Sequence, residues 1–312
     1  MEFRTQIPIS KSSNPIDYNS KMISLGSCFA VNMAEKFDYF KFQNTINPFG
    51  IIFNPVSIEK IIQRVAKQEL FTEKDIFFHN DLWNCYEIHS ELSHPDKEEF
   101  LNTLNQILNS TIEQLTDSTH ILITYGTSWI YRNIESRQIV ANCHKVPQKQ
   151  FTKELLSVEE IQKSIENTIG LIHSINPNAK FIFTVSPVRH IKDGFVENQL
   201  SKSHLFTGIH HILKEYNYFP SYEIMMDELR DYRFYAEDML HPNQVAVDYI
   251  WQLFRESYIE ESIFKTMNLI ENIQKSLKHK PFNPNSENHQ KFKTQLAEKI
   301  TNLVAEYSFM KF

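Results

Sequence analysis

Three short apolar runs stand out along the chain, and each ends in small or polar residues. The runs are Met22 to Leu25, Ile121 to Tyr125 and Phe181 to Val185, and they end in Gly26-Ser27, Gly126-Thr127 and Ser186-Pro187. Segments with apolar residues at helical spacing separate them. Strands that alternate with helices predict a parallel sheet covered on both faces. A site is then expected beyond the carboxyl ends of the strands, where Ser27, Gly126 and Ser186 would meet.

Further elements follow from capping and periodicity. Apolar residues at helical spacing predict a helix within Pro95 to Glu113, and a capping box of Ser157 and Glu160 begins another that ends before Asn176. Phe71 to His94 is irregular and predicts a long loop or a small hairpin. Gln244 to Ile259 predicts an amphipathic helix, and two more helices follow, broken at Pro281 to Asn285. We expect a catalytic domain at 1–260 and a C-terminal helical extension at 261–312.

Composition and charge limit the kinds of partner and the cellular compartment that we expect for this chain. The chain of 312 residues has a formal net charge of −6 and no strongly basic stretch, which argues against nucleic acid as a partner. The start of the sequence has no signal pattern and no 18-residue apolar run follows, so no membrane association is expected. Three cysteines, Cys28, Cys85 and Cys143, fit reduced thiols in the cytoplasm.

Two segments far apart in the sequence together offer the groups of an acyl-transfer site. Ser27 lies where the first apolar run turns into a helix, and Asp238 and His241 lie three residues apart near the other end. They would supply a nucleophile, an orienting acid and a base. Ser27 and Asp238 also have a purely structural interpretation, because Ser27 could cap the helix that it precedes and Asp238 could cap the helix after Pro242.

Several blocks of the sequence resemble one known family. They are Gly26-Ser27-Cys28-Phe29-Ala30, Asn47-Pro48-Phe49-Gly50, the segments 125–132 and 140–145, Ser186 to His190, and Tyr232 to Pro242. In this order they resemble the GSCFA-domain family, which is placed near the SGNH/GDSL hydrolases, over roughly residues 20 to 255. The resemblance implies a flavodoxin-like three-layer α/β/α domain, SGNH-hydrolase-like, with the C-terminal helices as an appendage.

The resemblance also implies roles for particular residues. Ser27 would be the nucleophile, with Asp238 and His241 as its catalytic partners. Backbone N–H groups of Ser27, Gly50 and Gly126 would form the oxyanion hole. The third block has Gly126-Thr127-Ser128 where related hydrolases have Gly-x-Asn, so Ser128, Asn142 or Asn47 would have to replace that asparagine.

Other polar residues of these blocks are candidates for substrate binding. They are Asn47, Asn142, His144, Arg189 and His190. Arg189 would either bind a substrate carboxylate or phosphate or pair with an acid such as Asp193. Cys143 is expected in the core. The 13 histidines form no paired pattern typical of zinc, and no metal site is expected.

The sequence thus favours a cytoplasmic serine esterase that removes a small acyl group such as acetyl from a small-molecule or carbohydrate ester, through an acyl-serine intermediate. No cofactor is required by this chemistry. Two alternatives stay open: an O-acyltransferase that uses the same site, and a non-catalytic ligand-binding or assembly module. The oligomeric state is undetermined.

Overall fold

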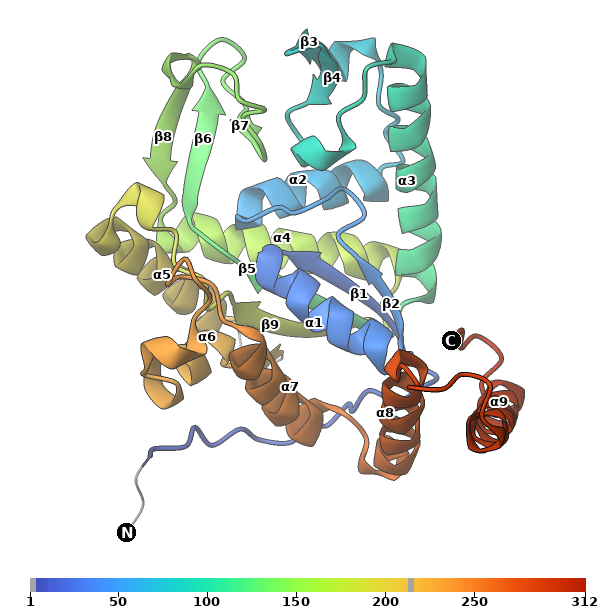
Figure 1. The fold of residues 1–312 in the computed structure, drawn as a ribbon. Helices are drawn as coiled ribbons and strands as arrows, with labels where there is room; N and C mark the ends of the chain where they lie inside the picture. The colour runs from blue at the N-terminus through green and yellow to red at the C-terminus, as the bar shows by residue number, and fades with distance from the viewer. Residues whose placement is uncertain (1–3, 213–215) are drawn as a thin grey trace.

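A five-stranded parallel sheet forms the centre of the computed structural model, which describes residues 4–212 and 216–312 (Figure 1). Its strands are β1 (Lys21–Gly26), β2 (Gln43–Ile46), β5 (His120–Tyr125), β9 (Lys180–Val185) and β10 (Asn217–Tyr218). They are ordered β10-β9-β5-β1-β2, and every neighbouring pair is parallel. Counted in chain order this is 2-1-3-4-5, the flavodoxin-like arrangement. The predicted α/β fold is confirmed.

Helices cover both faces of this sheet (Figure 1). One face carries α1 (Cys28–Tyr39) and α7 (Gln244–Tyr258), and the other carries α2 (Pro55–Ala66), α3 (Lys97–Asp117), α4 (Val158–Ile175) and α5 (Phe195–His210). Consecutive strand residues enter opposite cores: Ile121 and Ile123 face α2 to α5, whereas Leu122 faces α1 and α7. This two-sided burial explains why the strands read as continuous apolar runs.

The elements predicted from periodicity and capping are present. The Ser157–Glu160 capping box begins α4, which ends at Ile175. The helix predicted within Pro95 to Glu113 is α3, and the amphipathic helix after His241 is α7. Helices α8 (Phe264–Lys278) and α9 (Glu287–Glu306) flank the predicted break. The segment from Phe71 to His94 contains a hairpin of β3 (Ile76–His79) and β4 (Leu82–Cys85).

A second, antiparallel sheet lies beside this hairpin at the top of Figure 1. It has the order β7-β6-β8 and consists of β6 (Trp129–Asn133), β7 (Ile139–Val140) and β8 (Phe151–Leu155). A separate small core of Val140, Val146 and Phe151 fills this region, with Cys143 packed against it as expected. The remaining short helices are α6 (Ser221–Glu223), η1 (Glu73–Asp75), η2 (Ser90–Leu92), η3 (Gln148–Gln150), η4 (Ile191–Asp193), the π-helix η5 (Ile224–Glu228), η6 (Tyr232–Phe234) and η7 (Glu261–Ile263).

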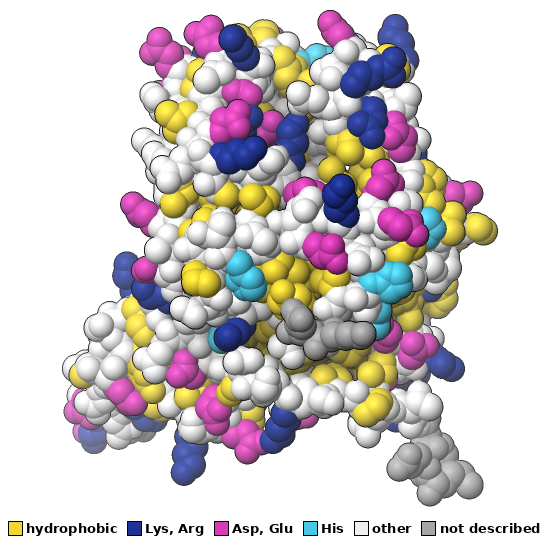
Figure 2. Space-filling model, turned by 180° about the vertical axis from the view of Figure 1, so that it is seen from behind, with side chains coloured by type: hydrophobic (Ala, Val, Ile, Leu, Met, Phe, Trp, Pro, Cys, Tyr) yellow, Lys and Arg dark blue, Asp and Glu magenta, His cyan; other side chains and the backbone are white. Residues whose placement is uncertain are grey.

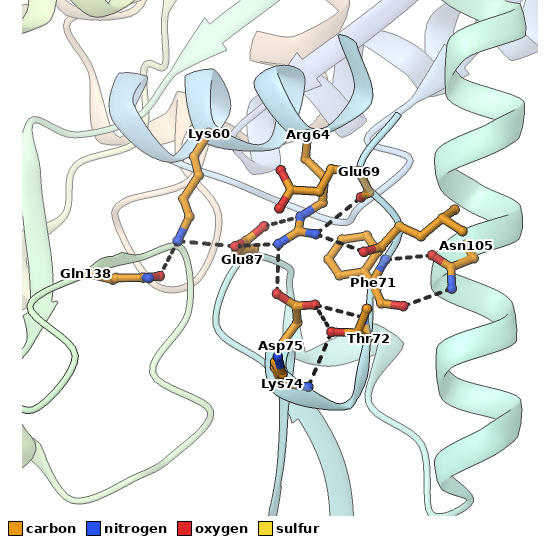
Figure 3. Close-up of polar contacts among 11 residues, drawn as sticks. Lys60, Arg64, Glu69, Phe71, Thr72, Lys74, Asp75, Glu87, Asn105 and Gln138 are labelled. Carbon is orange, nitrogen blue, oxygen red and sulfur yellow. Dashed lines mark hydrogen bonds and ion pairs between the residues drawn. The ribbon is translucent and has the colours of Figure 1, made fainter. Parts of the chain in front are cut away.

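A buried arginine joins α2 to the hairpin (Figure 3). Arg64 donates to Glu87 at 2.7 Å and to Asp75 at 2.9 Å, and it also donates to the carbonyls of Glu69 and Leu70. All the acceptors are carboxylates or backbone carbonyls, so the guanidinium is fully compensated where it is buried. This arginine is structural.

The C-terminal helices extend the core on the α1 and α7 side. Met267, Ile270 and Ile273 of α8 are buried there together with Leu303 of α9. The expected domain boundary after residue 260 stays a prediction.

The surface carries both signs of charge. Figure 2 views the molecule from behind the view of Figure 1 and shows basic and acidic side chains interspersed over that face. Over residues 4–212 and 216–312, every helix is too short or too polar to cross a lipid bilayer.

Candidate active site

The turn after β1 places Ser27 and Cys28 at the carboxyl end of the sheet. Gly26 has a φ of +125°, and a Cβ atom there would lie 2.0 Å from the Thr124 carbonyl oxygen. Only glycine therefore lets β1 approach β5 closely enough for the Ser27 N–H to reach that same oxygen, at 3.0 Å. Ser27 is the N-cap of α1 and Cys28 is its first residue.

Cys28 is the residue that meets the histidine of the last block. His241 Nε2 lies 3.7 Å from Cys28 Sγ, across 213 positions of sequence. The Ser27 hydroxyl is fully buried and has no hydrogen-bond partner within the described residues. It also makes no side-chain cap on α1, contrary to the structural reading of this serine. The structure brings the thiol, rather than the hydroxyl, next to the imidazole.

Asp238 orients His241 from the other side. Asp238 Oδ2 is 2.5 Å from His241 Nδ1, and its Oδ1 accepts the backbone N–H groups of Leu240 and His241 at 2.9 and 3.0 Å. These hydrogen bonds lower the pKa of Asp238 to about 2. The two side chains are each 45% exposed. The ionised carboxylate therefore holds Nδ1–H and leaves Nε2 free to accept the thiol proton, in a position that solvent and substrate can reach.

A sharp turn makes this arrangement possible. Met239 adopts a left-handed φ of 61°, and the Ala236 N–H donates to the His241 carbonyl at 2.8 Å. Tyr235 pairs with Pro242 as an isolated bridge, which ties the two sides of the turn together. The Asp-x-x-His spacing thus folds both side chains to the same side.

The expected oxyanion donors are already used by the backbone. The N–H of Ser27 donates to Thr124, that of Gly50 to Asn47 at 2.7 Å, and that of Gly126 to Phe53 at 2.8 Å. An N–H that is donated to a carbonyl cannot also bind an oxyanion at full strength. In this structure none of these three groups is available for that role.

Three other candidate residues make hydrogen bonds that hold the scaffold. The Asn47 side-chain oxygen accepts the Gly26 N–H at 2.7 Å and so holds the turn below Ser27. The Asn142 side chain accepts the His144 N–H at 2.8 Å, and His144 Nε2 lies 2.7 Å from the Cys85 carbonyl. Burial lowers the pKa of His144 to about 4, so it stays neutral, with its ring beside the stacked rings of Phe77 and Tyr86.

The third block also uses its polar groups internally. The Ser128 hydroxyl donates to the Ser201 carbonyl at 3.0 Å, and its N–H donates to the Ser201 hydroxyl at 2.8 Å. Ser128 and Asn142 are thus engaged in structural hydrogen bonds, whereas the Nδ2 group of Asn47 is buried without a hydrogen-bond partner among the described residues.

His190 is one candidate that the structure brings to the site. A Cβ atom built on Gly126 would lie 3.3 Å from His190 Nε2 and 3.3 Å from the Ser27 Cβ, which places the imidazole against the turn that carries Cys28. Burial, with smaller contributions from Lys202 and His241, lowers the pKa of His190 to about 3. Its Nε2 is buried without a partner among the described residues. It is therefore a neutral imidazole with one unused ring nitrogen.

Lys202 is a site residue that the sequence analysis missed. This lysine of α5 is completely buried, and its ammonium donates to the carbonyls of Gly126 and Ser186, both at 2.7 Å. It therefore ties together the ends of β5 and β9. Burial lowers its pKa to about 7, and its positive charge partly offsets the burial that raises the pKa of the Cys28 thiol. The sequence pattern does indicate that Lys202 is buried, because Lys202 shares one helix face with the apolar Leu205 and Ile209 at i, i+3 and i+7.

Two family profiles match the sequence of this chain. A family profile described as GSCFA family matches residues 21–254, and a second, described as GSCFA domain protein, C-terminal domain, matches residues 270–312. The first agrees with the range of the resemblance seen in the sequence blocks. The second extends the likeness to α8 and α9, beyond that range. A search of curated proteins gives no match.

Proposed function

This chain belongs to the GSCFA family, and we propose that it is an acyl-ester hydrolase whose nucleophile is the thiol of Cys28. The observation that carries the proposal is the relay from Cys28 Sγ to His241 Nε2, at 3.7 Å, and from His241 Nδ1 to Asp238, at 2.5 Å. It joins a nucleophile, a base and an orienting acid in the order that nucleophilic catalysis requires.

The first step is attack of the Cys28 thiol on the ester. His241 Nε2 accepts the proton of the Cys28 thiol while the sulfur attacks the carbonyl carbon of the ester. Burial raises the pKa of this thiol, so the resting group is protonated and needs the base. Asp238 stabilises the imidazolium that forms. The carbonyl π electrons move to oxygen and give a tetrahedral oxyanion.

The oxyanion needs donors that the backbone has not already used. The N–H groups of Cys28 and Phe29, at the start of α1, lie at the thiol, where they help to lower its pKa. The unpartnered Nε2 of neutral His190 supplies a further donor when it carries the ring proton. In this role His190 replaces the asparagine that the third block lacks. One such donor contributes about 2.7–4 kcal/mol to the transition state in other hydrolases.

The tetrahedral intermediate then collapses to a thioester on Cys28, which water hydrolyses. The oxyanion collapses, the C–O bond to the alcohol breaks, and the leaving oxygen takes the proton from His241. Water next attacks the thioester while His241 accepts its proton, and the C–S bond breaks to release the carboxylic acid and return the thiol. An alcohol acceptor in place of water would give acyl transfer from the same intermediate.

The substrate class comes from the family resemblance. We propose a small acyl group such as acetyl, carried by a small alcohol or a carbohydrate. The exposed Asp238–His241 pair fits access by a substrate of this kind. All three cysteines are free thiols, which supports action in a reducing compartment such as the cytoplasm.

The test compares the two adjacent nucleophile candidates. We would measure hydrolysis of p-nitrophenyl acetate by wild type, Cys28→Ala and Ser27→Ala, with Cys143→Ala, a thiol packed against the small core of the second sheet, as the control. Circular dichroism and thermal melts would verify folding. Mass spectrometry of acid-quenched reactions would locate the acyl group.

The proposal predicts loss of turnover and of the acyl adduct in Cys28→Ala alone, with a thioester on Cys28 in the wild type. If Ser27→Ala loses turnover and Cys28→Ala keeps it, the nucleophile is the serine. Equal rates in all four folded proteins would reject covalent catalysis at this site with this ester.

A further inference from the structure

Arg189 lies four residues beyond β9, at the same edge of the sheet as Cys28, and its side chain is half-buried. Its Nη2 donates to the Met226 sulfur at 3.1 Å, and its Nε is buried without a hydrogen-bond partner in the described parts of the chain. A guanidinium has five N–H donors and stays charged. Within residues 4–212 and 216–312 its hydrogen bond goes to a weak thioether acceptor, so most of its donors are unused.

The acids near Arg189 are held by other groups. Asp193, the partner considered from the sequence, pairs with Lys153 at 2.5 Å instead. Asp227 pairs with Arg230 at 3.6 Å, and both oxygens of Glu223 accept from the Tyr218 hydroxyl at 2.9 Å. Arg64 and Arg132, by contrast, each bind a carboxylate directly. Arg189 is thus a charged side chain with no acid partner among the described residues.

The guanidinium also borders the proposed reaction centre. The Met226 sulfur that it contacts accepts from the Tyr235 hydroxyl at 3.9 Å, and Tyr235 bridges to Pro242 in the turn that carries Asp238 and His241. On the chain, Arg189 is followed directly by His190, whose ring lies against Gly126. The arginine therefore stands between the turn of the last block and the end of β9.

Electrostatics favour an anion at this place. Lys202, a second basic group close to Arg189, is buried and bonded to carbonyls rather than to a carboxylate. The positive charge of Arg189 disfavours the charged form of that lysine. A carboxylate or phosphate could accept two parallel N–H bonds from the guanidinium and neutralise the excess charge.

We propose that Arg189 is an anion-binding subsite, so that the ester substrate carries a carboxylate or a phosphate group. The assignment to a substrate rests on the proposed function, whereas the anion site itself does not. Arg189 would act by positioning the substrate, with its acyl carbonyl near Cys28 and its anionic group near the end of β9.

The first experiment measures anion binding directly. Thermal unfolding of wild type, Arg189→Gln and Arg233→Gln would be followed in sodium acetate, in sodium phosphate and in sodium chloride at equal ionic strength. Arg233 is an exposed arginine of the same region and serves as the matched control. We expect a saturable rise in Tm of about 2 °C at tenfold excess over Kd in wild type and Arg233→Gln, and none in Arg189→Gln.

The two probe anions distinguish the two anionic groups that the substrate would carry. Preference for phosphate indicates a phosphorylated substrate, and preference for acetate indicates a substrate with a carboxylate. An equal rise in Arg189→Gln, or no rise above chloride in the wild type, would overturn the subsite.

A second experiment separates this subsite from the thiol mechanism. Cys28 would be alkylated with iodoacetate and with neutral iodoacetamide, and both rates would be normalised to glutathione. The subsite predicts a rate ratio of iodoacetate to iodoacetamide that falls severalfold in Arg189→Gln, with the iodoacetamide rate unchanged. An unchanged ratio would count against it. Failure of both reagents to label Cys28 would instead challenge the thiol nucleophile and leave the Tm result to decide the anion site.

Discussion

Replacing Lys202 with methionine should change how the stability of the protein depends on pH. The Lys202 ammonium is fully buried and bonded to the carbonyls of Gly126 and Ser186, with no carboxylate to compensate it among the bonds of the described chain. Burial lowers its pKa to about 7 in the folded protein. In the unfolded chain a lysine has its ordinary pKa of about 10.4.

The sign follows from proton binding. Between pH 7 and about pH 10 the unfolded chain keeps the lysine proton and the folded protein has lost it, so the unfolded state binds more protons. The free energy of unfolding therefore rises with pH in this range, and below pH 7 both states are protonated and the slope vanishes. With the two pKa values given, the wild type gains about 2 kcal/mol from Lys202 between pH 7 and pH 9.

Urea denaturation at pH 7 and pH 9 tests this value. The other titrating groups are shared by wild type and Lys202→Met, so the difference between the two free energies of unfolding isolates the lysine. We expect that difference to grow by about 2 kcal/mol in favour of the wild type at pH 9. Lys163→Met, at an exposed position of α4, should show no such growth. A difference that stays constant between the two pH values would refute the reasoning, because Lys202 would then be charged in both states.

Three further substitutions address the site, the turn beneath it and helix α4. Asp238→Asn should lower kcat on the order of 10²–10⁴-fold without unfolding the protein, since it removes the carboxylate that orients His241. Steady-state kinetics report kcat, and a melting curve reports folding. An unchanged kcat would exclude Asp238 from catalysis. Gly26→Ala should destabilise the protein by about 1–3 kcal/mol, because its Cβ would meet the Thr124 carbonyl oxygen at 2.0 Å. Gly170→Ala, where a Cβ meets nothing within 4 Å on an exposed helix face, should stabilise it by about 0.5–1 kcal/mol. Denaturation midpoints that move together for the two glycine variants would contradict this contrast.

The elements of the fold were readable because each has a local signature. Strand β5 is buried from both sides, so His120 to Tyr125 reads as an almost unbroken apolar run. The Ser157–Glu160 capping box marks the start of α4 within a few residues of sequence. The strands of the second sheet were harder to foresee. Strand β6 carries Trp129 and Arg132 half-exposed, and a short edge element such as β7 has too few residues to show a period.

The candidate site was only partly predictable. The Asp238–His241 pair was readable because it is local, and a single turn brings the two side chains together. Which residue His241 faces was not readable, because Ser27 and Cys28 are neighbours that point in different directions where a strand becomes a helix. The same holds for Gly50 and Gly126, whose N–H groups are donated to Asn47 and to Phe53.

The sequence by itself determined the α/β class, the helix caps, the family and the segments that meet at the carboxyl edge of the sheet. Only the tertiary structure decided that Cys28 meets His241, that Lys202 bridges Gly126 and Ser186, and that Arg189 has no acid partner within the described chain. The physical reason is the range of the interactions. Periodicity and capping are recorded among neighbours in the chain, whereas the partner of a buried polar group is chosen by the packing of segments far apart in sequence.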